Sequence, residues 1–292
     1  MKPVLFFIFL LVTASTNINA QDNLASQQKQ RLHELWSISN GLYEPESVAY
    51  DPISNKLFVT NVHGYSKNGL GYISRLDADG SNFEANWLTG LNGPTGIIFH
   101  DGKLYFADID TLKVADATSG DILAEYQTSD ENPGLNDVTI GPNETIYVSA
   151  SNSATIYKLI DGQLSVFIHD ARALRNANGL LATNNILISG GDALHAWQLE
   201  TGTHLGLLAA ENSEINNIDG ITINKNGALI LSLLNDPRLW QLKPAGSYSP
   251  VDQQQVHGVD ITLHPALNLL FAPRINLKTK EYSITAYMYD HH

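Results

Sequence analysis

The stretch from Leu135 to Ala150 reads LNDVTIGPNETIYVSA and sets the pattern for the whole chain. An Asn-Asp pair leads into a short apolar run, Val138 to Ile140, and the turn Gly-Pro-Asn-Glu separates it from a second run, Thr145 to Ala150. Alternating, β-branched residues on both sides of a Gly/Pro/Asn break are typical of a two-strand hairpin. The stretch therefore predicts two antiparallel strands joined by a tight connection.

The same unit recurs five more times along the chain, and its copies open at Glu46, Thr95, Asn178, Asp219 and Val259. With Asn136 included, the openings are 49, 41, 42, 41 and 40 residues apart. A repeat of about 41 residues has room for four strands, which is the size of a propeller blade. The six repeats predict an all-β fold, a six-bladed β-propeller.

The sixth repeat has room for only three strands, over residues 260–263, 269–272 and 282–289. We expect residues 32–38 to supply the missing outer strand, because pairing the two ends of the chain closes the ring and removes an exposed sheet edge. The alternative is an amphipathic helix over Gln27–Trp36, since Gln, Lys, Arg and Leu favour helix.

The start of the chain has the order of a secretory signal peptide. Lys2 precedes an apolar run from Val4 to Thr13, and a small, polar tail ends at Ala20. The run of about ten residues is too short to cross a bilayer about 30 Å thick as a helix. We expect cleavage after Ala20, with residues 21–292 as a single domain in a bacterial periplasm or the medium; a retained N-terminal anchor is the alternative.

The amino-acid composition limits the classes of molecule that this protein can be expected to bind. The chain has 30 Asp and Glu against 17 Lys and Arg, a formal net charge of −13, and no Cys. An acidic surface argues against nucleic acid and anionic membranes, which attract basic faces. The lack of Cys excludes disulfides, thiolate catalysis and Cys-ligated zinc. We expect a monomer that acts on a small-molecule substrate.

The residues that open the repeats are the candidate site, because the first strand of each propeller blade lines the central channel. Four of the six opening positions carry carboxylate or amide oxygens: Glu46, Asn136, Asn178 and Asp219. Ca²⁺ prefers such oxygen ligands, and Mg²⁺, Mn²⁺ or Zn²⁺ are possible. Two carboxylates and two amides would roughly neutralise a divalent ion and leave positions open for substrate.

Glu46, Asn136, Asn178 and Asp219 are called the cage below, and other polar residues are predicted to surround it. Thr95 opens the second blade, and His63 and Asp108 follow second strands, which return to the same face. We expect these three residues, together with Asn136, to contact the substrate. Each residue taken alone can also be an ordinary turn residue, because Asn and Asp cap backbone before strands. Recurrence in register at four of six positions favours the metal site.

The ordered set Pro45-Glu46-Ser-Val, Leu135-Asn136-Asp-Val, Ala177-Asn178-Gly-Leu and Ile218-Asp219-Gly-Ile resembles the metal-site motifs of the gluconolactonase/senescence-marker-protein/luciferin-regenerating-enzyme family. Paraoxonases and strictosidine synthase are structural relatives of that family. The resemblance covers all six repeats and implies a propeller with a divalent ion on the channel axis. It implies that Glu46, Asn178 and Asp219 bind the metal, that Asn136 binds metal or substrate, and that Asp219 is also the catalytic base for an attacking water.

Two departures from the family pattern bear on the substrate. Gluconolactonase-like members have an Arg two residues before the third-blade Asn, where this chain has Gly134. Paraoxonases have a His at the start of the second blade, where this chain has Thr95. The resemblance therefore predicts a metal-dependent hydrolase of lactones or related esters with an unspecified substrate. The alternative is a non-catalytic propeller that binds a ligand or protein partner and holds a structural metal.

Overall fold

The computed structural model describes residues 31–209, 214–264, 266–276 and 278–290. The predicted signal peptide lies outside these ranges. Within them, no helix combines the length and the apolar character that a membrane span requires.

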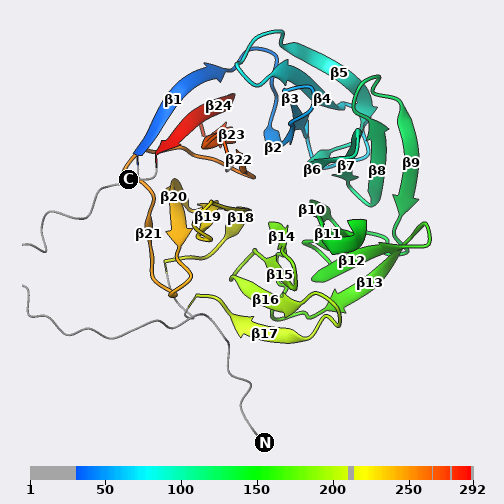
Figure 1. Ribbon diagram of the computed structural model, residues 1–292. Coiled ribbons are helices and arrows are strands. Elements are labelled where there is room, and N and C mark those ends of the chain that lie inside the picture. The colour runs from blue at the N-terminus through cyan, green and yellow to red at the C-terminus, as the bar shows by residue number, and fades with distance from the viewer. Residues whose placement is uncertain (1–30, 210–213, 265, 277, 291–292) are drawn as a thin grey trace, which may run out of the picture. The chain divides into compact units, whose positions relative to one another are not determined.

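Figure 1 shows six four-stranded sheets arranged as blades around a common centre. Blades one and two consist of β2 (Pro45–Asp51), β3 (Lys56–Asn61), β4 (Gly71–Asp77), β5 (Glu84–Leu91), β6 (Pro94–His100), β7 (Lys103–Asp108), β8 (Thr111–Asp116) and β9 (Ile122–Gln127). Blades three and four consist of β10 (Leu135–Ile140), β11 (Ile146–Ala150), β12 (Thr155–Ile160), β13 (Gln163–His169), β14 (Leu180–Ala182), β15 (Ile186–Ser189), β16 (His195–Gln198) and β17 (His204–Leu207). Blades five and six consist of β18 (Ile218–Ile223), β19 (Leu229–Leu233), β20 (Asp236–Leu242), β21 (Tyr248–Pro250), β22 (Thr262–His264), β23 (Leu269–Asn276), β24 (Glu281–Asp290) and β1 (Arg31–Ile38).

The predicted hairpin is strands β10 and β11, which pair antiparallel and are joined through a short 3₁₀ turn, Pro142–Glu144. All five residues of β11 are buried, because an inner strand of a blade is covered on both faces by the neighbouring blades. The six-bladed all-β architecture predicted from the repeat spacing is confirmed.

The ring closes through the N-terminal strand, as the sequence predicted. Strand β1 pairs antiparallel with β24, with Leu32 opposite Tyr289 and Ile38 opposite Ile284. The helix alternative is therefore wrong from residue 31 onward, and residues 27–30 lie outside the described ranges. Tertiary contacts outweigh helix propensity here: the indole Nε1 of Trp36 donates to the carbonyl of Ala78 in blade one at 3.1 Å.

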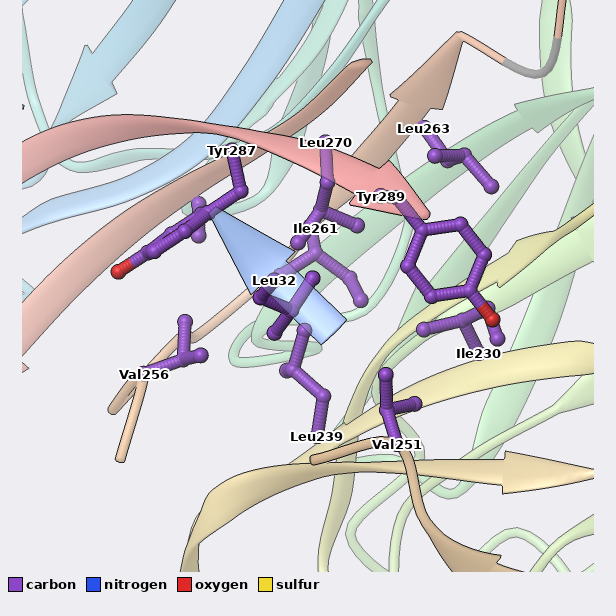
Figure 2. Close-up of a cluster of buried hydrophobic side chains, with 11 residues drawn as sticks. Leu32, Ile230, Leu239, Val251, Val256, Ile261, Leu263, Leu270, Tyr287 and Tyr289 are labelled. Atoms are coloured by element: carbon purple, nitrogen blue, oxygen red, sulfur yellow. The ribbon is translucent and has the colours of Figure 1, made fainter. Parts of the chain in front are cut away.

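The core consists of apolar clusters between neighbouring blades. Figure 2 shows the cluster between blades five and six, where Ile230 and Leu239 of blade five meet Leu270 and Tyr287 of blade six. Leu32 of β1 belongs to this cluster and is only 5% exposed. The closing strand is thus held by burial as well as by its ladder with β24.

Candidate functional site

Four blades carry the same irregularity where their first strand begins. Between β2 and β3 the register moves from Pro45 opposite Asn61 to Val48 opposite Val59, so the first strand has one extra residue. The equivalent shift occurs in blades two, three and five. Such bulges redirect side chains out of the regular alternation. They fall at Glu46, Thr95, Asn136 and Asp219, the opening residues of those blades.

A buried hydroxyl on the second strand supports three of these bulges. The backbone amide of Ser47 donates to Thr60 Oγ1 at 2.9 Å, and the amide of Asp137 donates to Ser149 Oγ at 2.9 Å. In blade five the amide of Gly220 donates to Ser232 Oγ at 2.8 Å. Each hydroxyl satisfies an amide that the bulge has removed from the ladder, which fixes the opening residue before it.

Glycines allow the first strands to approach one another closely. A Cβ atom at Gly179 would lie 2.1 Å from the carbonyl oxygen of Asp219, and one at Gly96 would lie 2.5 Å from the Cα of Asp137. No side chain fits at these distances. The glycines that follow opening residues Thr95 and Asn178 therefore hold the blades together around the centre.

Glu46 and Asp219 are buried at the centre, with exposed fractions of 4% and 3%. The side-chain amide of Asn178 hydrogen bonds to the carboxylate of Asp219. In the third blade, Asn136 Nδ2 donates to Ser151 Oγ at 3.2 Å. Both amides thus use their nitrogen in protein contacts, which leaves their oxygens available.

Those oxygens have no hydrogen-bond partner within the described part of the protein. Glu46 Oε2, Asn136 Oδ1 and Asn178 Oδ1 are buried and accept no hydrogen bond from any residue that the structure describes. Buried polar atoms are nearly always paired, so three unpaired acceptors at equivalent positions of three blades indicate a missing donor or cation. This arrangement fits a divalent ion with oxygen ligands.

The charges of the buried carboxylates at the channel centre favour the binding of a cation there. Burial raises the pKa of Glu46 well above its usual value, and the charges of Asp219, Asp260 and Asp137 raise it further. Burial also raises the pKa of Asp219 to about 7, although the hydrogen bond from Asn178 lowers it. Carboxylates that are buried together repel one another unless they are protonated or neutralised. A bound divalent ion would remove that repulsion.

The candidate cage mixes two carboxylates with two amides. No group of three or more His, Cys, Asp or Glu side chains is placed to hold a metal in the portion of the chain that the structure describes. The fit to a metal therefore depends on the amide oxygens of Asn136 and Asn178. Both residues are partly exposed, so the cage is reached from solvent.

Two further buried carboxyls, Asp137 and Asp260, lie next to the cage in the sequence and line a channel cavity of about 180 Å³. Asp137 accepts the amides of Val138 at 2.7 Å and Leu180 at 2.5 Å, and Ser47 Oγ donates to Asp260. Burial raises the pKa of Asp137 to about 7 and that of Asp260 well above its usual value. The pattern of opening residues does not point to either carboxyl, although Asp137 directly follows Asn136 and Asp260 directly follows Val259.

Thr95 and Asp108 lie at the rim but are engaged by the protein. The hydroxyl of Thr95 donates to the carbonyl of Asn136 at 2.9 Å, and Thr95 is 1% exposed. Asp108 is fully buried, accepts the amide of Gly93 at 2.7 Å, and pairs with Lys113 at 3.0 Å. Both residues join neighbouring segments of the ring. Their contact with a substrate stays a prediction.

His63 and Tyr65 lie in the connection between β3 and β4. His63 is partly exposed and stacks on Tyr43, with ring centroids 4.3 Å apart. Tyr65, which the sequence analysis missed, is 67% exposed. Desolvation, followed by the charges of Glu46 and Asp219, raises the pKa of its phenol well above the usual value. The contact of His63 with a substrate stays a prediction.

No protein-family model and no curated protein matches this chain in sequence. Its fold is shared with solved structures. One is a protein assigned to the gluconolactonases from its family, at 15% identity, with 90% of this chain and 94% of that chain covered and a TM-score of 0.67. A second is luciferin-regenerating enzyme, at 13% identity, with coverage of 89% and 95% and a TM-score of 0.63. A third is virginiamycin B lyase from Staphylococcus aureus, at 13% identity, with coverage of 89% and 99% and a TM-score of 0.60.

These comparisons confirm the resemblance to the gluconolactonase and luciferin-regenerating-enzyme structures as a likeness of fold. The class is a six-bladed β-propeller of this type. A lyase shares the fold, so the reaction must be argued from the site rather than from the architecture.

Proposed function

We propose that this chain is a metal-dependent hydrolase of lactones or related esters. The observation that carries the proposal is the set of unpaired buried oxygens, Glu46 Oε2, Asn136 Oδ1 and Asn178 Oδ1, beside the carboxylate of Asp219. The likeness of fold to a protein assigned to the gluconolactonases supports the same reaction class. We further propose export to a periplasm or the medium, a small-molecule substrate and a monomeric state.

Glu46, Asn136, Asn178 and Asp219 would hold the ion, and Ca²⁺ suits this donor set best because all four donors are hard oxygens. Mg²⁺, Mn²⁺ and Zn²⁺ are the alternatives. When bound, the ion supplies polarisation of the ester carbonyl and compensation for the charge that develops on its oxygen.

The protein's own groups orient the reaction. The bulge in blade five, supported by Ser232, fixes the backbone at Asp219, and the hydrogen bond from Asn178 orients its carboxylate. Asp219 would accept the proton of the attacking water as general base. The partly exposed Asn136 and Asn178 form the side of the cage that a substrate reaches from solvent.

The test uses the mature chain. Calorimetry should show one divalent site that a chelator empties, and a panel of aliphatic, aryl and sugar lactones should be hydrolysed only by the loaded protein. Loss of turnover on chelation and its return on reloading would support the proposal. A protein that binds a divalent ion and hydrolyses none of these lactones would be the alternative, a binding propeller with a structural metal. Absence of any divalent site would refute the metal cage.

A further inference from the structure

Arg274, at the rim of blade six, is a partly buried cation with no counter-charge among the residues that the structure describes. Its Nε is buried and has no hydrogen-bond partner, and none of the ion pairs in the described ranges includes it. Other arginines are paired: Arg75 with Glu84, Arg175 with Asp192 and Arg238 with Asp236. An unpaired buried charge is costly, and in a chain with net charge −13 partners are plentiful.

The residues at the equivalent position in blades one and two have a structural role that Arg274 cannot take over. Asn61 and Asp108 lie opposite Pro45 and Pro94, each one residue before an opening residue, and Arg274 lies opposite Gly258 in the same way. Asn61 and Asp108 each use a side-chain oxygen to accept backbone amides from the segment leading into their blade. A guanidinium has no acceptor and cannot take over this structural role.

A pocket of about 400 Å³ lies beside Arg274, between blades five and six. Its lining includes His257, Lys278, Leu233 and Val259. Val259 is the opening residue of blade six, so the pocket adjoins the ring of residues that forms the cage. The backbone of Arg274 pairs with Gly258, which directly follows His257. Burial lowers the pKa of His257, and the charge of Arg274 lowers it further.

The ionisable side chains at this pocket are mostly basic, in a protein that is acidic as a whole. His257 and Lys278 of the lining carry ionisable nitrogen groups, and Arg274 lies beside the lining, opposite Gly258. The one carboxylate of the described lining, Asp236, is paired with Arg238 at 2.6 Å. Leu233 and Val259 give the pocket an apolar wall for the carbon part of a ligand.

We propose that this pocket is the subsite for an acidic group of the substrate, a carboxylate or phosphate, whose ester bond lies at the cage. The proposal rests on the proposed function, and it defines the substrate class as esters or lactones that carry a second, anionic group. Arg274, whose backbone pairs with the lining residue Gly258, provides a charge beside the pocket, since a guanidinium binds such oxyanions strongly. Lys278 and His257 complete the site from its lining.

The kinetic test compares lactones that differ in one group, a free carboxylate or its carboxamide, on the metal-loaded protein. We expect kcat/KM to favour the carboxylate by about 10- to 100-fold, the value of a charge-assisted hydrogen bond. Arg274→Met should remove most of this preference by raising KM for the acid, with the carboxamide unaffected. Arg175→Met is the matched control, because Arg175 is exposed and paired with Asp192, and it should keep the preference.

A binding test separates this inference from the proposed function. Inorganic phosphate is titrated while the imidazole resonances of His257 are followed by NMR, which requires no turnover. A saturable shift that Arg274→Met abolishes and Arg175→Met retains supports the subsite even if no lactone is hydrolysed. The subsite is refuted if the native protein shows no saturable shift, and also if hydrolysis does not favour the carboxylate over the carboxamide. Should Arg274→Met fail to fold, Lys278→Met takes its place, and phosphate binding equal to the native protein would overturn the proposal.

Discussion

The channel contains two sets of polar side chains that differ in how their oxygens are used: an upper layer of Glu46, Asn136, Asn178 and Asp219, and a lower layer of Asp137 and Asp260. In the upper layer, Glu46 Oε2 and the amide oxygens of Asn136 and Asn178 accept nothing from the described part of the protein. In the lower layer, Asp137 accepts two backbone amides and Asp260 accepts the hydroxyl of Ser47. The upper layer is therefore arranged for a ligand, and the lower layer is satisfied by the protein itself.

Neighbouring residues of the same β-bulge can belong to different layers. Each bulge places two consecutive residues at the centre, and in blade three these are Asn136 and Asp137. The amide of the second residue is held by Ser149, so Asp137 is fixed by its backbone as well as by its carboxylate. The first residue keeps a free oxygen. Burial next to like charges costs both layers free energy, but only the upper layer can recover it by binding a cation.

The largest effect is expected from Asp219→Asn. The amide keeps an oxygen of similar size but loses the proposed base and one charge, so kcat should fall by about 10²- to 10⁴-fold with metal saturating. Metal occupancy must be measured alongside turnover, because a lost ion would mimic a lost base. Asp121→Asn is the matched control, since Asp121 is exposed in the turn between β8 and β9. Unchanged turnover in fully loaded Asp219→Asn would restrict Asp219 to a ligand role.

The two layers should also separate in the pH dependence of stability. The pKa values of Asp219 and Asp137 are raised to about 7, above their unfolded values. The chelated protein therefore gains stability from protonation that is complete below about pH 4 and is lost as the pH rises through about 7. We expect its free energy of unfolding to fall by about 2 to 4 kcal/mol between pH 5 and pH 8.

Denaturation with chelator and with saturating Ca²⁺ measures the contribution of each layer. Ca²⁺ should restore stability more at pH 8 than at pH 5, because the ion holds the upper carboxylates ionised. The pH dependence that remains in loaded protein then reports Asp137 and Asp260, and Asp137→Asn should reduce it. A chelated protein whose stability does not change between these pH values would show that the acids are not coupled as described.

Much of the fold, and the place of the opening residues near the start of each blade's first strand, could be predicted from the sequence. The spacing of the repeats fixed the number of blades, and the position of residues 32–38 beside a three-stranded repeat predicted ring closure. The opening residues were visible because they recur in register. Asp137 and Asp260 were harder to find, because the position after each opening residue is Ser, Gly or Asp in different blades and no period marks it. Strand pairing brings Arg274 opposite Gly258, and Tyr65 lies in the long connection between β3 and β4; one sequence does not reveal such pairing and loop geometry.

A smaller effect should follow from Glu46→Gln. The substitution removes one unit of charge from the upper layer while keeping an oxygen, so we expect the affinity for a divalent ion to fall by about tenfold or more. Calorimetry of the chelated and reloaded protein gives the change. Asp137→Asn is the matched control in the lower layer, and it should alter affinity far less. Equal losses in the two variants would mean that both layers bind the ion.

The smallest effect is expected from Ser47→Ala, which tests whether the layers are independent. Ser47 directly follows the proposed ligand Glu46, yet its hydroxyl donates to Asp260 in the lower layer. Removing the hydroxyl takes one hydrogen bond from a buried carboxyl group and one from the buried backbone amide of Ile97, which donates to Ser47 Oγ at 3.3 Å, so the free energy of unfolding should fall by about 1 to 3 kcal/mol. Because the backbone amide of Ser47 remains bonded to Thr60, the bulge and Glu46 should stay in place, and divalent affinity should change by less than about threefold. Thermal denaturation and calorimetry on the same variant give both values. A tenfold loss of divalent affinity with little loss of stability would contradict the independence of the two layers. It would show that the position of Glu46 depends on Asp260 through the hydroxyl of Ser47.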